Sequence, residues 1–392
     1  MRRRARRWHV TGTPAATHAA AGVLPRRVRP RGAARAAAAA LLCAAALLAV
    51  TLVILLGGCG GQTRQVRLIY AGSLIVPFDK LATAFEAAHP GVTVTTESHG
   101  SIQVLRHVTE LGDLFDLAVT ADEQLIPPLM YDRNDPYTGK PYADWYCNFA
   151  TNRVVLAVSP RSPLAGELTS ANWYRIVTRP DVRFGLADPR FDAAGYRSLM
   201  VLQLAERAYH DPFLFEDMVM GQFTSPITVD PVGGVDVIHV PEIVETTDGS
   251  HIILRGDSIG LLALLQSGDI DCAFEYESVA RQHGLEYVRL PASIDLGEPA
   301  QRASYRTVEV KLESQRFASV RPVFRGDLIR YAFTIPANAP DPGLAAEFAT
   351  FLLGPQGRRI LQQEDQPVLT PPTLDNAAAA PEGVRRACGG SE

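Results

Sequence analysis

Residues 66–74 read Val-Arg-Leu-Ile-Tyr-Ala-Gly-Ser-Leu. An apolar run that stops at a small residue, a glycine and a serine is typical of a buried strand that ends in a tight turn. Apolar residues then recur at helical spacing over 81–88, and a β-branched run follows over 92–96. A strand, a helix and a second strand in this order predict a parallel βαβ unit, which places the chain in the α/β class.

The alternation of strands and helices continues on both sides of a loop that is rich in Pro, Asp, Asn and Gly at 132–142. The apolar run 153–158 predicts a strand long enough to cross between two domains. Before the loop we expect helices at 101–111 and 123–130 and a strand at 114–119. After the crossing strand we expect helices at 173–177, 196–209 and 258–265 and strands at 182–186 and 271–276.

The rest of the chain predicts how the two sets are joined. Residues 224–250 mix Pro, Gly and β-branched residues, which indicates a strand-and-turn excursion. A strand at 328–335 and helices at 342–353 and 355–363 return to the first set. We therefore predict two α/β lobes joined by hinge strands, arranged as a clamp. Lobe 1 takes residues 66–150 and 328–373, lobe 2 takes 151–327, and the Ala, Pro and Gly content of 374–392 predicts a disordered tail.

The N-terminal 58 residues have the composition of an export signal. Ten arginines and no acidic residue occupy positions 1–35, and an uncharged apolar run follows over 36–56. Leu56-Gly57-Gly58-Cys59 closes that run and resembles the lipobox of bacterial lipoproteins, which implies cleavage before Cys59 and a lipid on its thiol. We expect a signal peptide at 1–58, a spacer at 59–65, and a lipid-anchored protein on the extracytoplasmic face of the cell membrane.

A plain transmembrane helix is the alternative for residues 36–56, because 21 apolar residues at about 1.5 Å each can span a hydrocarbon core of about 30 Å. The Gly-Gly-Cys sequence at its outer end favours the lipobox, and both interpretations place the body outside the cytoplasm. Without residues 1–58, the 38 basic side chains fall by ten to 28 against 42 acidic ones, a formal charge of −14. This acidic body lacks the basic surface of a nucleic-acid partner.

The remaining chemistry-bearing residues predict no catalytic centre and no cofactor. Neither a G-x-S-x-G, Walker or H-E-x-x-H motif nor a pair of histidines at a metal-ligand spacing occurs after Cys59. Cys147, Cys272 and Cys388 form no zinc pattern, and a single bridge between Cys147 and Cys272 stays open. We therefore expect a monomeric binding protein rather than an enzyme.

Small and hydroxyl residues recur where a predicted strand gives way to a helix. Ser73 follows the first strand, Gly100 and Ser101 follow the second, and Gly195 lies in the run that leads into the helix at 196–209. Helix N-termini that converge on one cleft can bind an anion through their N–H groups, with serine hydroxyls as further donors. Helix capping and tight turns explain each of these residues alone, but open α/β sheets bind ligands at the carboxyl ends of strands.

Six segments in matching order carry a resemblance to a known family. They are Ala-Gly-Ser-Leu at 71–74, Asn-Trp-Tyr at 172–174, Arg-Pro-Asp-Val-Arg-Phe-Gly at 179–185, Gly-Tyr-Arg-Ser at 195–198, Gln-Ser-Gly-Asp-Ile-Asp at 266–271 and Ser-Val-Ala-Arg-Gln-His at 278–283. From about residue 66 to 372 the chain resembles the tungstate/molybdate-binding proteins of ABC importers, in the group common in archaea. The resemblance implies a type II periplasmic-binding fold that closes over one tetrahedral oxyanion and delivers it to a permease and its ATPase.

The resemblance also implies site residues. Ser73 and Ser101 match serines that contact the oxyanion, Asp192 falls where a carboxylate oxygen faces the metal atom, and Tyr276 falls where a hydroxyl donates to the anion. The family's second metal-facing carboxylate is replaced by Ser258 in our alignment, although Asp257 could take its place after a one-residue shift. A site that holds the anion by donors alone is the alternative.

Three neighbouring residues and two other functions complete the expectations. Arg197 either stabilises a closed form beside the site or forms an ion pair on a helix face, and Glu275 and Glu277 are expected at a solvated or interlobe edge. The same clamp could serve sulfate, phosphate or an organic anion. It could also belong to an exported enzyme or a ligand sensor, because a fold alone does not determine function.

Overall fold

The computed structural model describes Ala44 and residues 64–313 and 323–389. Residues 62–392 form one compact unit with its own hydrophobic core, separate from residues 1–61. The predicted signal peptide, Cys59 and the candidate apolar span 36–56 therefore lie, apart from Ala44, outside the described residues. Among the residues that are described, no helix combines the length and apolarity that a bilayer crossing requires.

The first lobe is built on a six-stranded mixed sheet in the order β15-β4-β14-β3-β1-β2. β1 pairs in parallel with both β2 and β3, as the βαβ prediction requires, and β14, β4 and β15 add antiparallel pairings. The strands are β1 (Arg64–Ala71), β2 (Val92–His99), β3 (Leu117–Thr120), β4 (Tyr146–Thr151), β14 (Arg330–Thr334) and β15 (Val368–Asp375).

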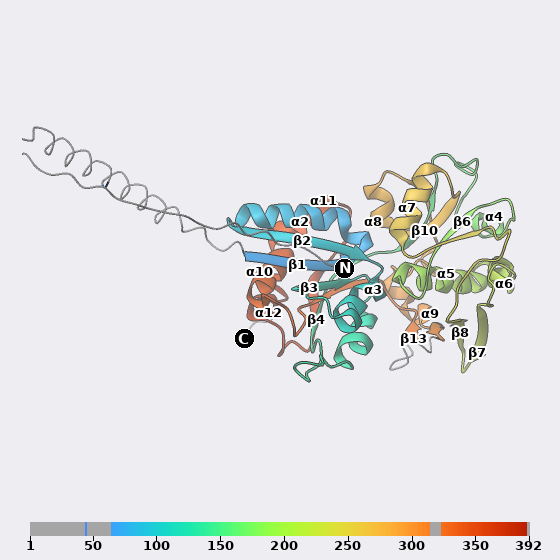
Figure 1. Cartoon of the computed structure of the whole chain (residues 1–392). Coiled ribbons are helices and arrows are strands. Elements are labelled where there is room, and N and C mark those ends of the chain that lie inside the picture. Colours follow the sequence, from blue (N-terminus) through green and yellow to red (C-terminus); the bar gives the residue numbers. More distant parts are fainter. Residues whose placement is uncertain (1–43, 45–63, 314–322, 390–392) are drawn as a thin grey trace, which may run out of the picture. The chain divides into compact units, whose positions relative to one another are not determined.

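Helices cover this sheet, and α2 and α11 pack against each other over its β1–β2 half (Figure 1). The apolar side of α2 buries Phe78 and Phe85, and the Phe85 ring meets Phe348 of α10 edge-on at 5.0 Å. The helical elements are η1 (Gly72–Leu74), α2 (Ile75–Ala88), α3 (Ser101–Arg106), the π-helical η2 (His107–Leu111) and η4 (Pro127–Tyr131), η3 (Glu123–Leu125), α10 (Pro342–Leu353), α11 (Pro355–Gln363) and α12 (Glu382–Ala387).

The second lobe contains a five-stranded sheet in the order β11-β5-β10-β6-β9. Its central strand β10 is buried along its whole length, as expected for a strand covered on both faces. The strands are β5 (Val154–Val158), β6 (Phe184–Ala187), β9 (Ile252–Arg255), β10 (Cys272–Tyr276) and β11 (Glu286–Arg289). The helical elements are α4 (Trp173–Val177), α5 (Ala193–Tyr209), α6 (Leu214–Val219), α7 (Ser258–Ser267), α8 (Glu277–Gln282), η5 (Pro299–Gln301) and α9 (Arg302–Tyr305).

A third, four-stranded sheet in the order β13-β12-β8-β7 lies beside α5. The predicted strand-and-turn excursion forms the antiparallel hairpin of β7 (Thr228–Val232) and β8 (Val235–Val240). Its parallel pairing with β12 (Val308–Leu312), which in turn pairs with β13 (Val323–Arg325), was not predicted. The side chains of β12 alternate between buried and half-buried, so its period of two was readable in Val-Glu-Val-Lys-Leu.

Two short segments carry the chain between the lobes. β4 ends at Thr151 and β5 begins at Val154, so Asn152 and Arg153 make the first crossing. The return runs through 326–329, between β13 and β14. The Asn152 amide donates to Ser278 Oγ of α8 at 2.8 Å and to the Tyr331 hydroxyl of β14 at 3.2 Å, so one side chain binds both lobes at the crossing.

The prediction of a disordered tail from residue 374 is wrong for the described residues 374–389. Leu374 pairs with Cys147 in the first-lobe sheet, and α12 buries Val384 completely against the α10 side of the lobe. Of the two positions expected for Glu275, a solvated or an interlobe edge, the solvated one is wrong, because Glu275 lies in the central strand β10 and is 1 % exposed. Local composition predicted exposure in both cases, and tertiary packing buries these segments.

Candidate functional site

The carboxylate of Asp192 lies where the N-termini of three helices meet. Its Oδ1 accepts from Ala194 N of α5 at 3.2 Å, and its Oδ2 accepts from Ser258 N of α7 at 3.0 Å. The start of α3 lies beside this carboxylate, since a Cβ on its N-cap residue Gly100 would be 3.0 Å from the Asp192 Cβ. Unsatisfied N–H groups and the partial positive charge of a helix N-terminus both favour an anion, so this junction is a pre-built anion seat.

A close backbone contact between the lobes holds α3 at this seat. Ile102 N and Gln103 N of α3 donate to the Phe191 carbonyl of the second lobe at 3.1 and 3.4 Å. A Cβ on Gly100 would lie 2.5 Å from that carbonyl oxygen, so only glycine permits the approach. Gly100 therefore serves the contact between lobes, which is a stronger requirement than the turn that the sequence predicted.

Two buried carboxyl groups share this junction. Burial raises the pKa of Asp192 above its ordinary value, against the opposing effect of the N–H donors from Ser258 and Ala194. Glu275 accepts from Tyr276 N at 2.9 Å, and its Oε1 has no partner among the described residues. Burial, reinforced by the charges of Asp192 and Asp257, raises the pKa of Glu275 to about 8. Glu275 is therefore mostly protonated at neutral pH, which lowers the negative charge that an incoming anion meets.

A second cluster beside the seat joins the lobes through a buried cation. The Arg197 guanidinium of α5 donates to the Ala121 carbonyl at 2.8 Å and lies 3.1 Å from Asp122 Oδ2, both just after β3 of the first lobe. It also donates to the Tyr276 hydroxyl at 2.7 Å. The Tyr276 oxygen thus accepts from Arg197, and the hydroxyl hydrogen can be donated to a further acceptor. These contacts fit the first interpretation of Arg197, a cation that holds the lobes together beside the site, rather than an ion pair on a helix face.

The predicted first-lobe serines are both buried and both already hydrogen-bonded. Ser73 Oγ lies 3.0 Å from the Tyr331 hydroxyl, whose ring is 6.0 Å from that of Tyr276. Ser101 Oγ accepts from Ala121 N at 3.1 Å. Each hydroxyl can make further hydrogen bonds, because a hydroxyl carries one donor and two acceptor positions.

The three residues that the sequence placed less firmly have distinct positions. Ser258 is buried and donates its N–H to Asp192. The Asp257 carboxylate caps α7 by accepting from Gly260 N at 2.9 Å. Gly195 serves packing, since a Cβ there would lie 2.4 Å from the Ala187 carbonyl oxygen at the end of β6.

The structure therefore joins Asp192 to Ser258 by a hydrogen bond and places Ser101, at the start of α3, beside them. Ser73 hydrogen-bonds Tyr331, whose ring contacts that of Tyr276. Sequence reasoning missed Glu275, Asp122, Tyr331 and Asn152. An acid inside the apolar strand 272–276 was a readable signal for Glu275, and a position just past a strand's carboxyl end was one for Asp122. Tyr331 and Asn152 carry no local signal, because their roles arise only where the two lobes meet.

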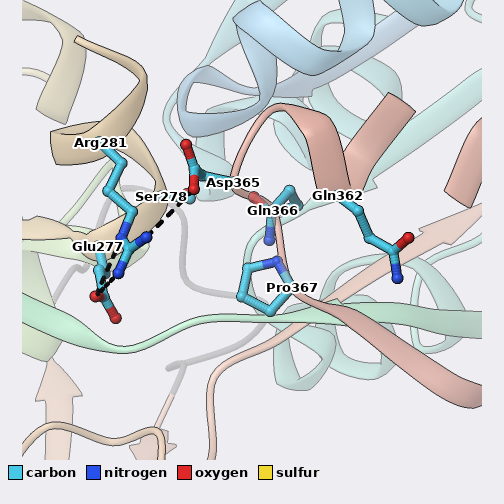
Figure 2. Close-up of a pocket in the computed structure, with 7 residues that line it drawn as sticks. All are labelled: Glu277, Ser278, Arg281, Gln362, Asp365, Gln366 and Pro367. Carbon is cyan, nitrogen blue, oxygen red and sulfur yellow. Dashed lines mark hydrogen bonds and ion pairs between the residues drawn. The ribbon is translucent and has the colours of Figure 1, made fainter. Parts of the chain in front are cut away.

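A pocket of about 300 Å³ lies between α8 and the end of α11 with the segment that follows it (Figure 2). Arg281 pairs with Glu277 one turn away on α8 at 3.0 Å and reaches across the pocket to Asp365 at 3.4 Å. Two carboxylates against one guanidinium make it a poor seat for an anion. None of the predicted ligand residues lines it.

Two α/β lobes joined by short crossings, with buried polar groups from both at their junction, define a two-lobed binding protein. The chain belongs to the family of bacterial extracellular solute-binding proteins, whose family model matches residues 66–364. Members of this family and fold are not enzymes, and membership implies a location outside the cytoplasm. The predicted solute-binding class and the α/β type II periplasmic-binding fold are confirmed.

Individual relatives support the same class. An uncharacterized solute-binding protein of Methanoculleus marisnigri is 40 % identical over 307 residues, which cover 78 % of this chain and 82 % of the relative. The molybdate/tungstate-binding protein WtpA of Pyrococcus abyssi is 35 % identical over 320 residues, or 80 % and 87 % of the two chains. The periplasmic molybdate-binding protein of Azotobacter vinelandii has a similar fold, with a TM-score of 0.50 at 13 % identity over 77 % of this chain and 98 % of that one.

Proposed function

We propose that this chain is an extracytoplasmic binding protein of an ABC transporter that takes up molybdate or tungstate. The oxyanion would bind at the junction of the lobes, against the N-termini of α3, α5 and α7, and would pass from there to a permease and its ATPase. The observation that carries the proposal is the convergence of two backbone N–H groups, from the starts of α5 and α7, on the single carboxylate of Asp192. The identity to a molybdate/tungstate-binding relative supports the choice of cargo.

The geometry suits a small dianion for three reasons. The N–H donors come from helix starts, which stabilise negative charge without a lysine or arginine that would bind any anion. Hydroxyls of Ser73, Ser101 and Tyr276 can add donors from both lobes. The protonation of Glu275 removes a repulsive charge at neutral pH, because its pKa is raised to about 8.

Asp192 has the central role in the proposal. Its oxygens accept the N–H bonds that the cargo would also use, so binding requires the carboxylate to turn. A carboxylate oxygen that then bonds the metal atom turns a repulsive neighbour of the dianion into a ligand. X-ray absorption of the molybdate complex would report this bond as a coordination number above four, and a four-coordinate spectrum would contradict the ligand role.

The cargo is tested by calorimetric titration of residues 62–392 with molybdate, tungstate, sulfate and phosphate. We expect the first two to bind more tightly than the last two. Tighter binding of sulfate or phosphate would transfer the proposal to those oxyanions. Failure of all four, together with binding of an organic anion or of a membrane receptor, would favour the other uses of the clamp.

The membrane tether is a separate proposal that rests on Leu56-Gly57-Gly58-Cys59. Mass analysis of the N-terminal peptide from cells should show chains that begin at a lipid-modified Cys59. A Cys59→Ala variant should carry no lipid and should keep residues 1–58 uncleaved, while it binds oxyanion normally. An unmodified mature N-terminus would refute the anchor and leave the cargo proposal unaffected.

A further inference from the structure

Cys388 lies beside Cys147, a partner that the spacing of the cysteines along the chain did not suggest. Cys147 is on β4, with no exposed surface, and Cys388 follows α12 near the end of the described chain. Their Sγ atoms are 3.5 Å apart across 241 residues of sequence. Cys272 lies in β10 of the other lobe, completely buried, so the pairing of Cys147 with Cys272 that the sequence left open does not fit.

We propose that Cys147 and Cys388 form a disulfide that fastens the C-terminal helix to the first-lobe sheet. A disulfide sulfur–sulfur distance is about 2.05 Å, so the two atoms must approach by about 1.5 Å, within reach of side-chain rotation. Backbone pairing of Leu374 with Cys147 already holds the entry to this C-terminal segment against β4. The extracytoplasmic space that the family implies is oxidising enough for such a bond to form and persist.

The two thiols differ in exposure and in pKa, and a stepwise oxidation requires such a difference. Cys388 is partly exposed, and its hydrogen bond with Cys147 lowers the pKa of its thiol. The pKa of the Cys147 thiol is raised, first by that hydrogen bond and then by burial. Cys388 as thiolate attacks the disulfide of an extracytoplasmic thiol oxidase, giving a mixed disulfide and releasing one thiol. Cys147 then displaces the second oxidase sulfur, so one S–S bond has formed here and the oxidase carries both electrons and both protons as a dithiol.

The bond has a structural task because α12 cannot hold itself in place. It has six residues, and an isolated helix shorter than about 12 residues is marginal in water. Val384 is the buried residue that docks it. A covalent link just after the last turn stabilises this docking by restricting the undocked chain.

The test uses residues 62–392, which form a compact unit of their own and carry Cys147, Cys272 and Cys388. After exposure to oxidised glutathione and then denaturation, we expect one titratable thiol instead of three and a mass lower by two hydrogen atoms. Peptide mapping should join the peptides of Cys147 and Cys388. Protein from the extracytoplasmic fraction of cells, alkylated without reduction, should show the same link.

Matched variants keep the outcome unambiguous. Cys272→Ser should leave no titratable thiol after oxidation, whereas Cys388→Ser should keep two and should speed hydrogen exchange over 376–389. Three remaining thiols in the oxidised protein, glutathione adducts on Cys147 or Cys388, or links between separate chains would each overturn the proposal. None of these results depends on the oxyanion.

A different observation carries a second proposal, at the end of β2. His99 and His107 stack with their ring centroids 4.2 Å apart, and Glu97 Oε1 lies 2.6 Å from His99 Nε2 and 3.9 Å from His107 Nδ1. One ligand atom from each of these three residues falls within 4.8 Å of the other two. Asp113 Oδ2 adds a second carboxylate, 2.8 Å from His107 Nδ1. We call these four residues the β2-end cluster.

We infer that the β2-end cluster binds a divalent first-row transition-metal ion of the Zn²⁺ class. Two imidazoles and one or two carboxylates are the donor types and number that Zn²⁺ takes. The Glu97 side chain is half-exposed and both imidazoles are partly exposed, so an ion can enter. The ion would take the place of the hydrogen atoms that now bridge these side chains.

The probe is Zn²⁺ itself, titrated calorimetrically into residues 62–392 prepared without a polyhistidine tag. We expect one ion per chain and a higher unfolding temperature with Zn²⁺. His107→Asn and Glu97→Gln should each weaken binding by more than about tenfold, and Asp113→Asn by about tenfold. Co²⁺ in the same site should show the intense visible absorption of a four-coordinate ion.

His239→Asn is the matched control, because His239 also meets two carboxylates, Asp230 at 3.3 Å and Glu313 at 3.0 Å, but no second imidazole. This variant should bind Zn²⁺ as the parent does. Absence of binding, or binding that survives His107→Asn and is lost in His239→Asn, would overturn the inference. Unfolding curves without metal show whether each variant is folded.

Discussion

Replacement of Asp122 by asparagine should weaken oxyanion binding, although the side chain at this position is not among the proposed oxyanion ligands. Asp122 lies just after β3 of the first lobe, and its Oδ2 accepts from Tyr196 at 2.6 Å and pairs with Arg197 at 3.1 Å, both on α5 of the second lobe. The two charged side chains are 2 % and 3 % exposed. Asparagine keeps the shape of the side chain and can still cap the turn that Asp122 begins through its oxygen. Its NH2 group replaces Oδ2, so the change removes the charge and the acceptor that Tyr196 and Arg197 share.

The magnitude follows from the burial of the cation that is left behind. Arg197 would keep the Ala121 carbonyl and the Tyr276 hydroxyl but would have no counter-charge. Removal of one partner from a buried ion pair costs about 3–5 kcal/mol. Because the partners belong to different lobes, this cost falls on the state in which the lobes meet, which is the state that would hold the cargo. About 3 kcal/mol corresponds to a roughly 100-fold loss of affinity.

Calorimetric titration of molybdate into the parent, Asp122→Asn, Arg197→Met and the double variant completes a cycle. The double variant should recover part of the loss, since it leaves no lone buried charge. Arg179→Met is the control, because Arg179 pairs with Glu167 and Asp181 on the surface of the same lobe and should not matter. Unchanged molybdate affinity in a folded Asp122→Asn protein would refute the reasoning and assign the pair to stability alone.

Three further outcomes are expected. Gly195→Ala should destabilise the fold by roughly 1–3 kcal/mol in urea unfolding, because the added Cβ would lie 2.4 Å from a carbonyl oxygen. Gly256→Ala is the control and should be neutral, because open space surrounds Gly256. Equal effects of the two variants would contradict the packing argument. Glu275 should keep its proton in the folded protein up to about pH 8 but lose it near 4.5 when unfolded, so unfolding free energy should fall as pH rises between these values. Glu275→Gln should flatten this pH dependence of the unfolding free energy. A pH dependence parallel to that of the parent protein would contradict the raised pKa of Glu275. Asp192→Asn should weaken molybdate binding at least about tenfold. Asp257→Asn, whose side chain still caps α7 and which loses only a charge that acts on Glu275, should change it less than about twofold. Tighter binding by Asp192→Asn would mean that Asp192 competes with the cargo.

Local signals predicted the elements that depend on local physics. The bounds of α10 and α11 agree with the prediction to the residue, because Pro342 and Pro355 occupy first helical positions, Asp341 caps the first helix, and Gly354 separates the two. Most remaining strands and helices are displaced by one to a few residues, as expected where the end is set by pairing rather than by a cap.

Long-range pairing explains what the sequence did not predict. The β12 strand alternates correctly, yet its partner β8 is about 70 residues away and nothing local names it. The C-terminal segment has a loop composition but is held by Cys147 and by α10. At the site, single residues such as Asp192 and Ser258 could be proposed one at a time. Their shared hydrogen bond depends on two helix starts meeting, which no spacing along the chain encodes.

The crossing at Asn152 and Arg153 limits how the lobes can move. Two residues have four soft backbone torsions, and the return at 326–329 adds a few more. A hinge with so few free torsions loses little conformational entropy when the lobes close. Ordering one backbone residue costs about 1–2 kcal/mol, and only a few residues are involved. Little of the free energy of solute binding would then be lost in ordering the chain.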